Sequence, residues 1–311
     1  MRHPDSTPSQ PEFAPSAPSA SPAATPKVWP DFSDLPALRD IFALAKALLE
    51  PPRLDRPGHE LLPGAHRDTV IALVRSALAH VQPELRNPER LPRDGGVLVV
   101  SNHALMGIDS FALFPLILQH VDRLPRGLAD TFLAHAPLVG RVLHNAGVVE
   151  ANPGNARQLL QQGEMVVAYP GGAGESFKGP DSHYQLQWKN RMGFVRLAMR
   201  AQVPILPIMG AGIDHAYQYL FHERVLVRKL VGKDDARYDF PVSLGLGILP
   251  LPGRFTFHVG EPIVPPPDPS LADDPHAVAE LHQRVWSTAQ AQLDEAMRVW
   301  RQEMGLAKGP P

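Results

Sequence analysis

The sequence contains no cysteine among its 311 residues, and its net charge is only −2. The missing thiols exclude disulfide bonds, thiolate metal sites and a cysteine nucleophile, but they leave the redox compartment undetermined. The absence of excess positive charge excludes nucleic-acid binding driven by bulk charge, so no nucleic-acid partner is expected. An apolar content of 44% and a chain of this length predict a globular protein with a sizeable core.

Long hydrophobic runs are also missing. A transmembrane helix needs about 18 or more consecutive apolar residues. The longest such stretch here is 111–118, and Pro115 interrupts it. The first residues show no apolar segment of the kind found in signal peptides, so neither a span nor a secretion signal is expected.

Proline, by contrast, is abundant, with 35 residues where an average composition of roughly 5% would give about half as many. Residues 1–30 consist largely of Pro, Ser and Ala. This composition predicts a disordered tail, with a proline-rich ligand for a partner protein as the alternative. We therefore divide the chain into a tail over 1–30, an N-terminal helical region over 31–85 and a main domain over 86–311.

Apolar residues recur at helical spacing in two segments of the N-terminal region, which predicts amphipathic helices near 35–49 and 67–81. The segment 51–64 between them is rich in proline and is predicted to be a loop. The apolar positions of the first helix are Leu38, Ile41, Phe42, Ala45, Leu48 and Leu49. Those of the second helix are Val70, Leu73, Val74, Ala77, Leu78 and Val81.

Beyond residue 90, short runs of β-branched residues alternate with helical patterns, which indicates an α/β fold. We expect a largely parallel sheet flanked by helices, preceded by the N-terminal helical pair and closed by a long C-terminal helix. That last helix is predicted to begin at Pro275, with Asp274 as its N-cap. The expected strands are 97–100, 148–149, 165–169, 205–209 and 255–259, and the expected internal helices are 156–162 and 191–201.

The first candidate site directly follows the predicted strand 97–100. Residues that follow a strand of an α/β sheet lie where ligands bind. His103 could act there as a general base, and Asp109 could return across the loop to its other ring nitrogen if Gly107 lets the chain turn. In the alternative interpretation, Asp109 is only the N-cap of a helix that starts at Ser110.

The second candidate site is the glycine-rich segment 169–178, which follows the predicted strand 165–169. Its three glycines permit close backbone approach to a ligand, and their amides could bind an anion or an oxyanion. The segment fails the nucleophile-elbow pattern at Lys178 and also fails the phosphate-loop pattern. A glycine-rich turn that only reverses the chain is the alternative.

Three blocks in a fixed order, at 102–109, 169–172 and 203–208, resemble the glycerolipid acyltransferase family, which includes the lysophosphatidate acyltransferases. The segments 249–252 and 260–263 are also similar to that family. The resemblance implies transfer of a fatty acyl group from acyl-CoA or acyl carrier protein to a lipid hydroxyl. It implies that His103 is the base and that Asp109 orients it.

Further site residues follow from the same resemblance and from the glycine-rich segment. The expected substrate-binding residues are Asn102, Gly107, Pro170, Gly171, Gly172, Ala173, Gly174, Glu175 and Lys178. No metal and no cofactor is expected beyond the acyl thioester, which is a co-substrate. The basic residues of 189–200 could meet the phosphates of an acyl carrier protein, or they could form a solvated face.

The chain departs from the common family pattern at informative positions. Five residues instead of four separate His103 from Asp109. Gly171 and Gly174 stand where the block Pro-Glu-Gly-Thr-Arg has Glu and Arg, and the segment 147–152 lacks the arginine of the second block. These variants resemble the branch that contains phytyl ester synthases and diacylglycerol acyltransferase-like proteins.

The missing arginines bear on the acceptor. An arginine–phosphate contact is worth about 1.5–3 kcal/mol, so we expect a neutral acceptor such as a mono- or diacylglycerol or a long-chain alcohol. Lys178 and Arg191 could substitute, which leaves a lysophosphatidate or lysophospholipid acyltransferase as the alternative. A lipid esterase with Ser176 as nucleophile and a non-catalytic lipid-binding protein are further alternatives.

Both substrates implied by the resemblance are amphiphiles, so the protein must reach a membrane. We expect monotopic contact through the helices near 35–49 and 67–81, at the cytoplasmic inner face of the membrane. The alternative is that these two helices only cover the core of the main domain.

Overall fold

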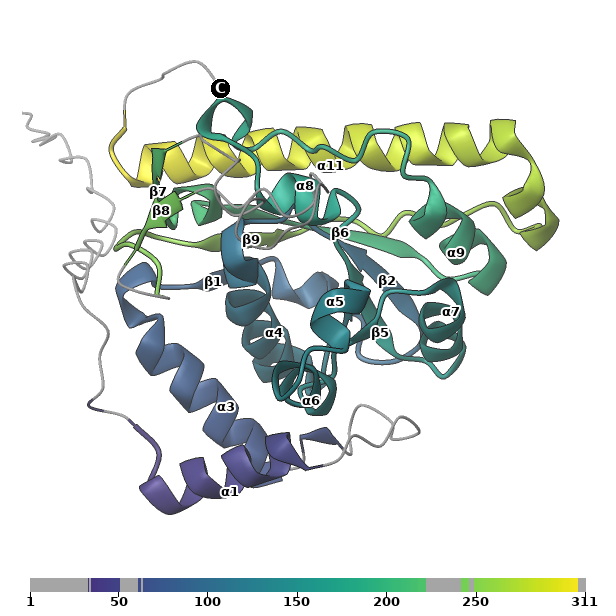
Figure 1. Ribbon diagram of the computed structural model, residues 1–311. Helices are drawn as coiled ribbons and strands as arrows, with labels where there is room; N and C mark the ends of the chain where they lie inside the picture. Colours follow the sequence, from purple (N-terminus) through teal and green to yellow (C-terminus); the bar gives the residue numbers. More distant parts are fainter. Residues whose placement is uncertain are drawn as a thin grey trace, which may run out of the picture.

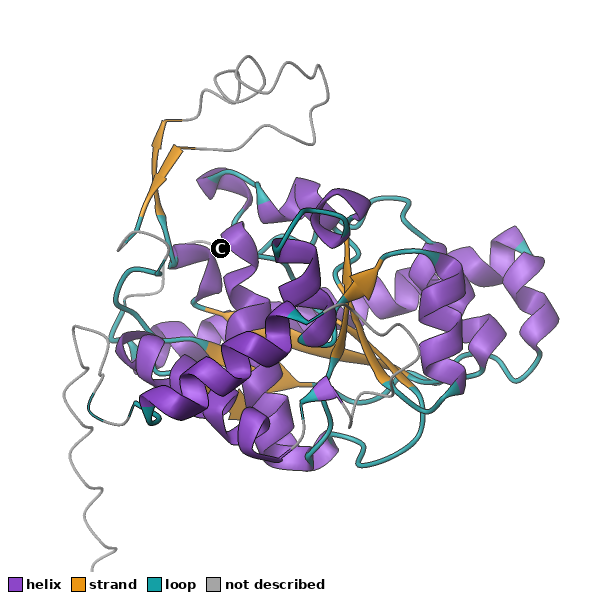
Figure 2. Ribbon diagram, turned by 60° about the horizontal axis from the view of Figure 1, so that its bottom comes forward, coloured by secondary structure: helices purple, strands orange, loops and turns teal. Residues whose placement is uncertain are grey.

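The computed structural model describes residues 33, 35–50, 61–62, 64–221, 242–245 and 249–306. Its centre is a seven-stranded sheet of order β1-β9-β6-β2-β5-β3-β4, with helices on both faces (Figures 1 and 2). All neighbouring strands run parallel except β6 and β9. The strands are β1 (Glu84–Arg86), β2 (Val97–Val100), β3 (Arg126–Ala129), β4 (Val149–Glu150), β5 (Met165–Ala168), β6 (Ile205–Ala211) and β9 (Thr256–Val259). The predicted α/β fold with a largely parallel sheet is confirmed.

The helices confirm most of the sequence-based expectations and extend them. The longer helices are α1 (Leu38–Leu49), α3 (Gly64–Ala77), α4 (Ile108–Val121), α7 (Pro153–Gln161), α9 (Gly193–Ala201) and α11 (Pro275–Glu303). Shorter ones are α5 (Thr131–Ala134), α6 (Val139–Asn145) and α8 (Gly172–Ser176). A separate antiparallel pair consists of β7 (Gln218–Phe221) and β8 (Val242–Leu244). The predicted tail over 1–30 and most of the predicted loop over 51–64 lie outside the described residues.

Strand β2 shows why the sheet has two covered faces. All four of its residues are buried. Val97 and Val99 pack with α4, whereas Leu98 and Val100 pack with α7, α9 and α11. Continuous β-branched and apolar residues are typical of a parallel strand that is buried on both sides, because successive side chains point to opposite faces.

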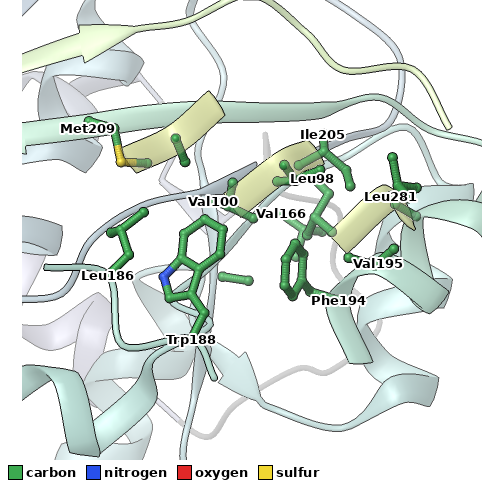
Figure 3. Close-up of a cluster of buried hydrophobic side chains, with 14 of the residues drawn as sticks. Leu98, Val100, Val166, Leu186, Trp188, Phe194, Val195, Ile205, Met209 and Leu281 are labelled. Carbon is green, nitrogen blue, oxygen red and sulfur yellow. The ribbon is translucent and has the colours of Figure 1, made fainter. Parts of the chain in front are cut away.

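The buried cluster that contains Leu98 and Val100 also holds a long connection in place. Leu186 and Trp188, from the segment between α8 and α9, insert against the sheet beside Phe194 (Figure 3). Trp188 is fully buried and meets Phe194 edge to face, with ring centroids 5.5 Å apart. The connection that follows the glycine-rich segment is therefore anchored in the core.

The C-terminal helix α11 begins as predicted. The side chain of Asp274 accepts a hydrogen bond from the backbone N–H of His276, and Pro275 occupies the first helical position. Its apolar stripe, including Trp300, is buried along one face of the sheet (Figure 1).

Helix α1 forms where it was predicted, but much of its expected apolar face does not pack. Leu44, which lay outside that set, is the buried residue of the helix and belongs to a buried apolar cluster that also contains Leu118 and Leu124. Leu38 and Phe42 are each 72% exposed. The helix has apolar side chains on more than one side, and only the side that carries Leu44 faces the rest of the fold.

Candidate active site

The candidate site lies where three adjacent parallel strands end. Strand β2 lies between β5 and β6 and is parallel to both, so the loops after all three strands emerge at one edge of the sheet. The loop after β2 carries His103, the loop after β5 carries the glycine-rich segment, and Asp214 follows β6 in the short helix η5 (Ile213–His215). This is the edge at which open α/β sheets bind ligands.

His103 and Asp109 are brought together as predicted from the sequence. The Nδ1 atom of His103 lies 3.0 Å from Oδ2 and 3.2 Å from Oδ1 of Asp109. The carboxylate is fully buried, whereas the His103 side chain is 19% exposed. With Nδ1 bonded to the acid, Nε2 is the ring nitrogen that can exchange a proton with a substrate.

The alternative interpretation of Asp109 as a helix cap is wrong. Helix α4 begins at Ile108, with Gly107 as its N-cap residue, and Asp109 lies inside the first turn. Gly107 has a φ of +67°, a conformation that glycine adopts without strain. This turn lets the chain reverse between the histidine and the acid, and Asp109 also accepts the backbone N–H of Ala104 at 3.1 Å.

Tyr169 forms a wall of the site. Its ring stacks on the His103 imidazole with centroids 4.2 Å apart and an interplanar angle of 21°. Its hydroxyl oxygen accepts a hydrogen bond of 2.8 Å from Ser110. Burial, followed by the negative charge of Asp109, raises the pKa of Tyr169 well above its ordinary value, so the phenol stays protonated near neutral pH.

Asn102 is buried and joins two strands. Its side-chain amide donates to the carbonyl of Gly210 at 2.9 Å and accepts the N–H of the same residue at 2.8 Å. Both polar atoms of the Asn102 side chain are thereby used to tie the end of β2 to β6. The proposed contact of Asn102 with substrate stays a prediction.

The side chain of Glu175 packs directly against the backbone of the glycine-rich segment at Gly171. A Cβ atom added to Gly171 would lie 1.9 Å from Oε2 of Glu175, so no larger residue fits while Glu175 is in place. Gly172 has a φ of +53°, and its N–H donates to the carbonyl of Tyr169 at 2.9 Å. Pro170 and Gly171 are buried, Gly172 and Ala173 are half-buried, and Gly174 is exposed.

Glu175 and Lys178 lie beneath the site surface. The carboxylate of Glu175 accepts the backbone N–H of His103 at 2.9 Å and that of Gln187 at 3.0 Å. The ammonium of Lys178 lies 2.8 Å from Asp214 and donates to the carbonyl of His103 at 2.7 Å. Burial raises the pKa of Glu175, whereas Lys178 and the two N–H groups act in the opposite direction.

Two other candidate groups differ in accessibility. Arg191 is exposed and donates to the carbonyls of Pro170 and Gly171 at 3.2 and 2.7 Å. Ser176 is buried, and its hydroxyl donates to the carbonyl of Ala104 at 2.9 Å. Arg191 is therefore an accessible cation beside the glycine-rich segment, whereas the hydroxyl of Ser176 points into the protein.

Asp214 was missed by the sequence analysis. Its position five residues after the predicted strand 205–209 was the available signal, because β6 neighbours β2. The predicted basic face over 189–200 was partly wrong, because α9 starts only at Gly193. Its residues Arg196 and Arg200 bind Ala272 and Asp273 within the chain.

The described part of the chain shows two further features. In it, no three His, Asp or Glu side chains gather as a group that could hold a metal ion. A mainly apolar groove of about 360 Å³ lies away from His103, between α3 and α4, and Val74, Ala112 and Leu116 contribute to its lining.

Residues 82–210 match the protein-family model described as Acyltransferase. An uncharacterized protein of Mycobacterium bovis is 34% identical over 218 residues, which cover 68% of this chain and 60% of the relative. The chain thus spans less than two thirds of that relative's length.

Two relatives carry descriptive names. The DGAT1/2-independent enzyme synthesizing storage lipids of Bos taurus is 27% identical over 241 residues, covering 78% of this chain and 68% of the relative. The chloroplastic phytyl ester synthase 2 of Arabidopsis thaliana is 25% identical over 240 residues, covering 68% of this chain and 33% of the relative. These similarities confirm the resemblance that the ordered sequence blocks indicated.

Proposed function

We propose that this chain, whose residues 82–210 match the family model described as Acyltransferase, transfers a fatty acyl group from an acyl thioester to a hydroxyl group of a lipid. The observation that supports this most directly is the His103–Asp109 pair, with a distance of 3.0 Å at the end of a central strand. Among the described residues, Nε2 of His103 has no hydrogen-bond partner, which leaves it available to a substrate. The acyl donor is acyl-CoA or acyl carrier protein.

In the proposed reaction, Nε2 of His103 accepts the proton of the acceptor hydroxyl as the oxygen attacks the thioester carbonyl. Asp109 accepts a hydrogen bond from Nδ1 and stabilises the imidazolium that forms. Collapse of the tetrahedral adduct breaks the carbon–sulfur bond, and the imidazolium returns its proton to the thiolate. An ester and a free thiol result, so protons and electrons balance without a further reactant.

The glycine-rich segment is our candidate for the oxyanion site. The N–H of Gly172 is already bonded to Tyr169, so we assign the developing charge to the N–H groups of Ala173 and Gly174. Gly174 is exposed at this position, and its missing side chain leaves room for a substrate to approach the backbone.

The contacts around the site support a neutral acceptor, namely a mono- or diacylglycerol or a long-chain alcohol. Lys178, one candidate for a phosphate contact, is buried and paired with Asp214. Arg191 is the remaining candidate, and its guanidinium is engaged by two loop carbonyls. The names of two relatives, a storage-lipid enzyme and a phytyl ester synthase, are consistent with neutral acceptors for this chain.

An acceptor panel tests this proposal. Purified protein is incubated with radiolabelled acyl-CoA, and in parallel with acyl carrier protein thioester, against diacylglycerol, a long-chain alcohol and lysophosphatidate. Formation of neutral ester, abolished in His103→Ala, supports the proposal. A clear preference for lysophosphatidate overturns the neutral acceptor but keeps the acyl transfer. Binding of acyl thioester without transfer to any acceptor favours the lipid-binding alternative, and ester hydrolysis favours the esterase.

We further propose that α1 brings the enzyme to a membrane surface at its cytoplasmic face. None of the described helices is both long and apolar enough to cross a bilayer. Leu35, Leu38, Phe42 and Leu49 on and beside α1 are 44–72% exposed. The spacing of these residues places them along one stripe of the helix, and a side chain such as Phe42 can enter the interface of a bilayer.

Vesicle flotation tests this contact. The double variant Leu38→Ser/Phe42→Ser should lose most of its binding to phospholipid vesicles, because it removes the two most exposed apolar side chains of α1. Val264→Ser is the matched control, because Val264 is 69% exposed but lies in the loop after β9. Equal flotation of the double variant and the wild type would contradict the proposed contact.

A further inference from the structure

We propose that Glu175, Lys178 and Asp214 form a buried chain of charges that holds the main chain of His103 and so positions its imidazole. The inference rests on the proposed acyl transfer and goes beyond it. It assigns a positioning role to Glu175 and Lys178 in place of the expected contact with substrate, and it adds Asp214, which the sequence analysis missed.

The first contact of this chain fixes the peptide group that precedes the His103 side chain. The backbone N–H of His103 donates to Oε1 of Glu175 at 2.9 Å. The other oxygen of Glu175 accepts the N–H of Gln187, next to the buried Trp188. One carboxylate thereby ties the loop after β2 to a connection that the core already anchors.

The second contact fixes the peptide group that follows His103. Its carbonyl oxygen accepts a hydrogen bond of 2.7 Å from Nζ of Lys178. The N–H of the same peptide group, which belongs to Ala104, donates to Asp109 at 3.1 Å. Charged side chains therefore hold both ends of this peptide unit, and Asp109 binds the ring and the backbone of the histidine loop together.

Asp214 completes the arrangement from the third strand. Its Oδ1 atom lies 2.8 Å from Nζ of Lys178, and its Oδ2 atom accepts the N–H of Tyr184 at 2.8 Å. Both side chains of the pair are 2% exposed. The ammonium of Lys178 is thus held in place from β6, so three loops on adjacent strands are joined behind the imidazole.

Burial gives these groups a positioning role. Glu175 and Lys178 have 0% and 3% of their surface exposed, and the carboxylate oxygens of Glu175 and the ammonium of Lys178 are bonded within the protein. A buried charge network of this kind is rigid when it is fully satisfied. These backbone contacts restrain the φ and ψ angles of His103. The hydrogen bond to Asp109 and the stacked Tyr169 then suffice to fix the orientation of the ring.

Steady-state kinetics of matched double variants test the proposal. Lys178→Met/Asp214→Asn removes both charges of the ion pair together, while Glu175 keeps the backbone N–H groups of His103 and Gln187 as donors. We expect kcat to fall by about 10²-fold, the effect of a displacement of about 1 Å, while KM stays within about twofold. The control is Arg126→Met/Glu164→Gln, which removes a largely buried pair where β3 and β5 begin, at the opposite end of these strands from the site, and should leave kcat within about twofold.

Glu175 provides a graded series. Glu175→Gln keeps one acceptor for the two N–H groups, whereas Glu175→Leu keeps none. We expect kcat to fall less in the first variant than in the second, with both folded by circular dichroism. Equal kcat in wild type, Glu175→Leu and the folded Lys178→Met/Asp214→Asn variant would overturn the positioning role.

A spectroscopic readout separates failure of this inference from failure of the proposed function. The Nδ1–H proton of His103, hydrogen-bonded to Asp109, should give a downfield NMR resonance that disappears in His103→Gln. We expect the resonance to shift or broaden in Lys178→Met/Asp214→Asn and to persist in the Arg126/Glu164 control. Unchanged resonances in all folded variants overturn the inference whether or not acyl transfer is found, whereas absent transfer with a shifted resonance overturns only the function.

Discussion

Two regions of this molecule reverse the usual distribution of side chains in opposite ways. At the ends of β2, β5 and β6, the charged side chains of Asp109, Glu175 and Lys178 are buried, with exposures of 0–3%. On α1, the large apolar side chains of Leu38 and Phe42 are 72% exposed. Charged residues are rarely fully buried unless they are paired, and extended exposed apolar patches often mark interaction surfaces.

The two regions differ in whether their unusual side chains have partners within the protein. Each charge named at the strand ends has a partner, which for Asp109 lies in its own loop and for Glu175 and Lys178 lies on another loop, so removal of one member leaves others without a partner. The exposed side chains of α1 contribute little to folding, because they make few internal contacts. Substitutions should therefore affect chemistry and stability in the first region and membrane contact in the second.

The largest expected effect is on turnover. His103→Ala removes the proposed base and should lower kcat by about 10²–10⁴-fold. His120→Ala is the control, because His120 is an exposed histidine at the C-terminal end of α4, the helix that follows the His103 loop. Near-normal turnover of His103→Ala would remove the basis for the site assignment.

The next effect is on stability. Lys178→Ala leaves Asp214 as a lone buried charge and should lower the free energy of unfolding by about 3–5 kcal/mol, measured by chemical denaturation. Lys46→Ala on α1 removes an exposed lysine and should change it by less than about 0.5 kcal/mol. Similar losses in the two variants would show that the Lys178–Asp214 pair contributes no more to the free energy of unfolding than an exposed lysine does.

A smaller loss is expected where a neutral side chain joins two strands. Asn102→Ala leaves the N–H and the carbonyl of Gly210 without their partner and should cost about 1–3 kcal/mol. Asn190→Ala, at an exposed asparagine, should be neutral in the same unfolding assay. An unchanged midpoint for Asn102→Ala would mean that water or a shifted backbone replaces the amide.

The smallest effect on stability is expected on α1. Leu38→Ser/Phe42→Ser should change the free energy of unfolding by no more than about 0.5 kcal/mol, in contrast to its effect on vesicle binding. Leu44→Ala is the contrasting variant on the same helix and should cost about 2–5 kcal/mol, because Leu44 is buried. A large stability loss for the serine pair would show that these side chains pack within the fold.

The same contrast shows what the sequence alone could predict. Continuous apolar, mostly β-branched residues at 97–100 predicted a buried strand, and the order of strand and loop placed His103 at a sheet edge. The Asp109 partner required only one turn, which Gly107 provides. Such features depend on neighbours in sequence, so local rules capture them.

Other features depend on contacts between distant segments. Asp214 reaches Lys178 behind the site only because β6 lies next to β2, and no local sequence pattern shows that strand order. Leu44 was not assigned to the packed side of α1, because apolar residues occur on more than one side of that helix. Helix α4 was not delimited, because Pro115 lies in its interior, where proline normally interrupts a helix.

The close approach of Gly171 to Glu175 constrains how this protein can be redesigned. A Cβ atom added at position 171 would overlap both the carboxylate and the Cβ atom of Glu175, so position 171 cannot be enlarged while Glu175 is in place. A library that introduces larger residues at 171 should recover folded clones only when position 175 shrinks in the same clone. Replacement of the segment by a loop from a distant relative should therefore exchange 170–175 as one cassette.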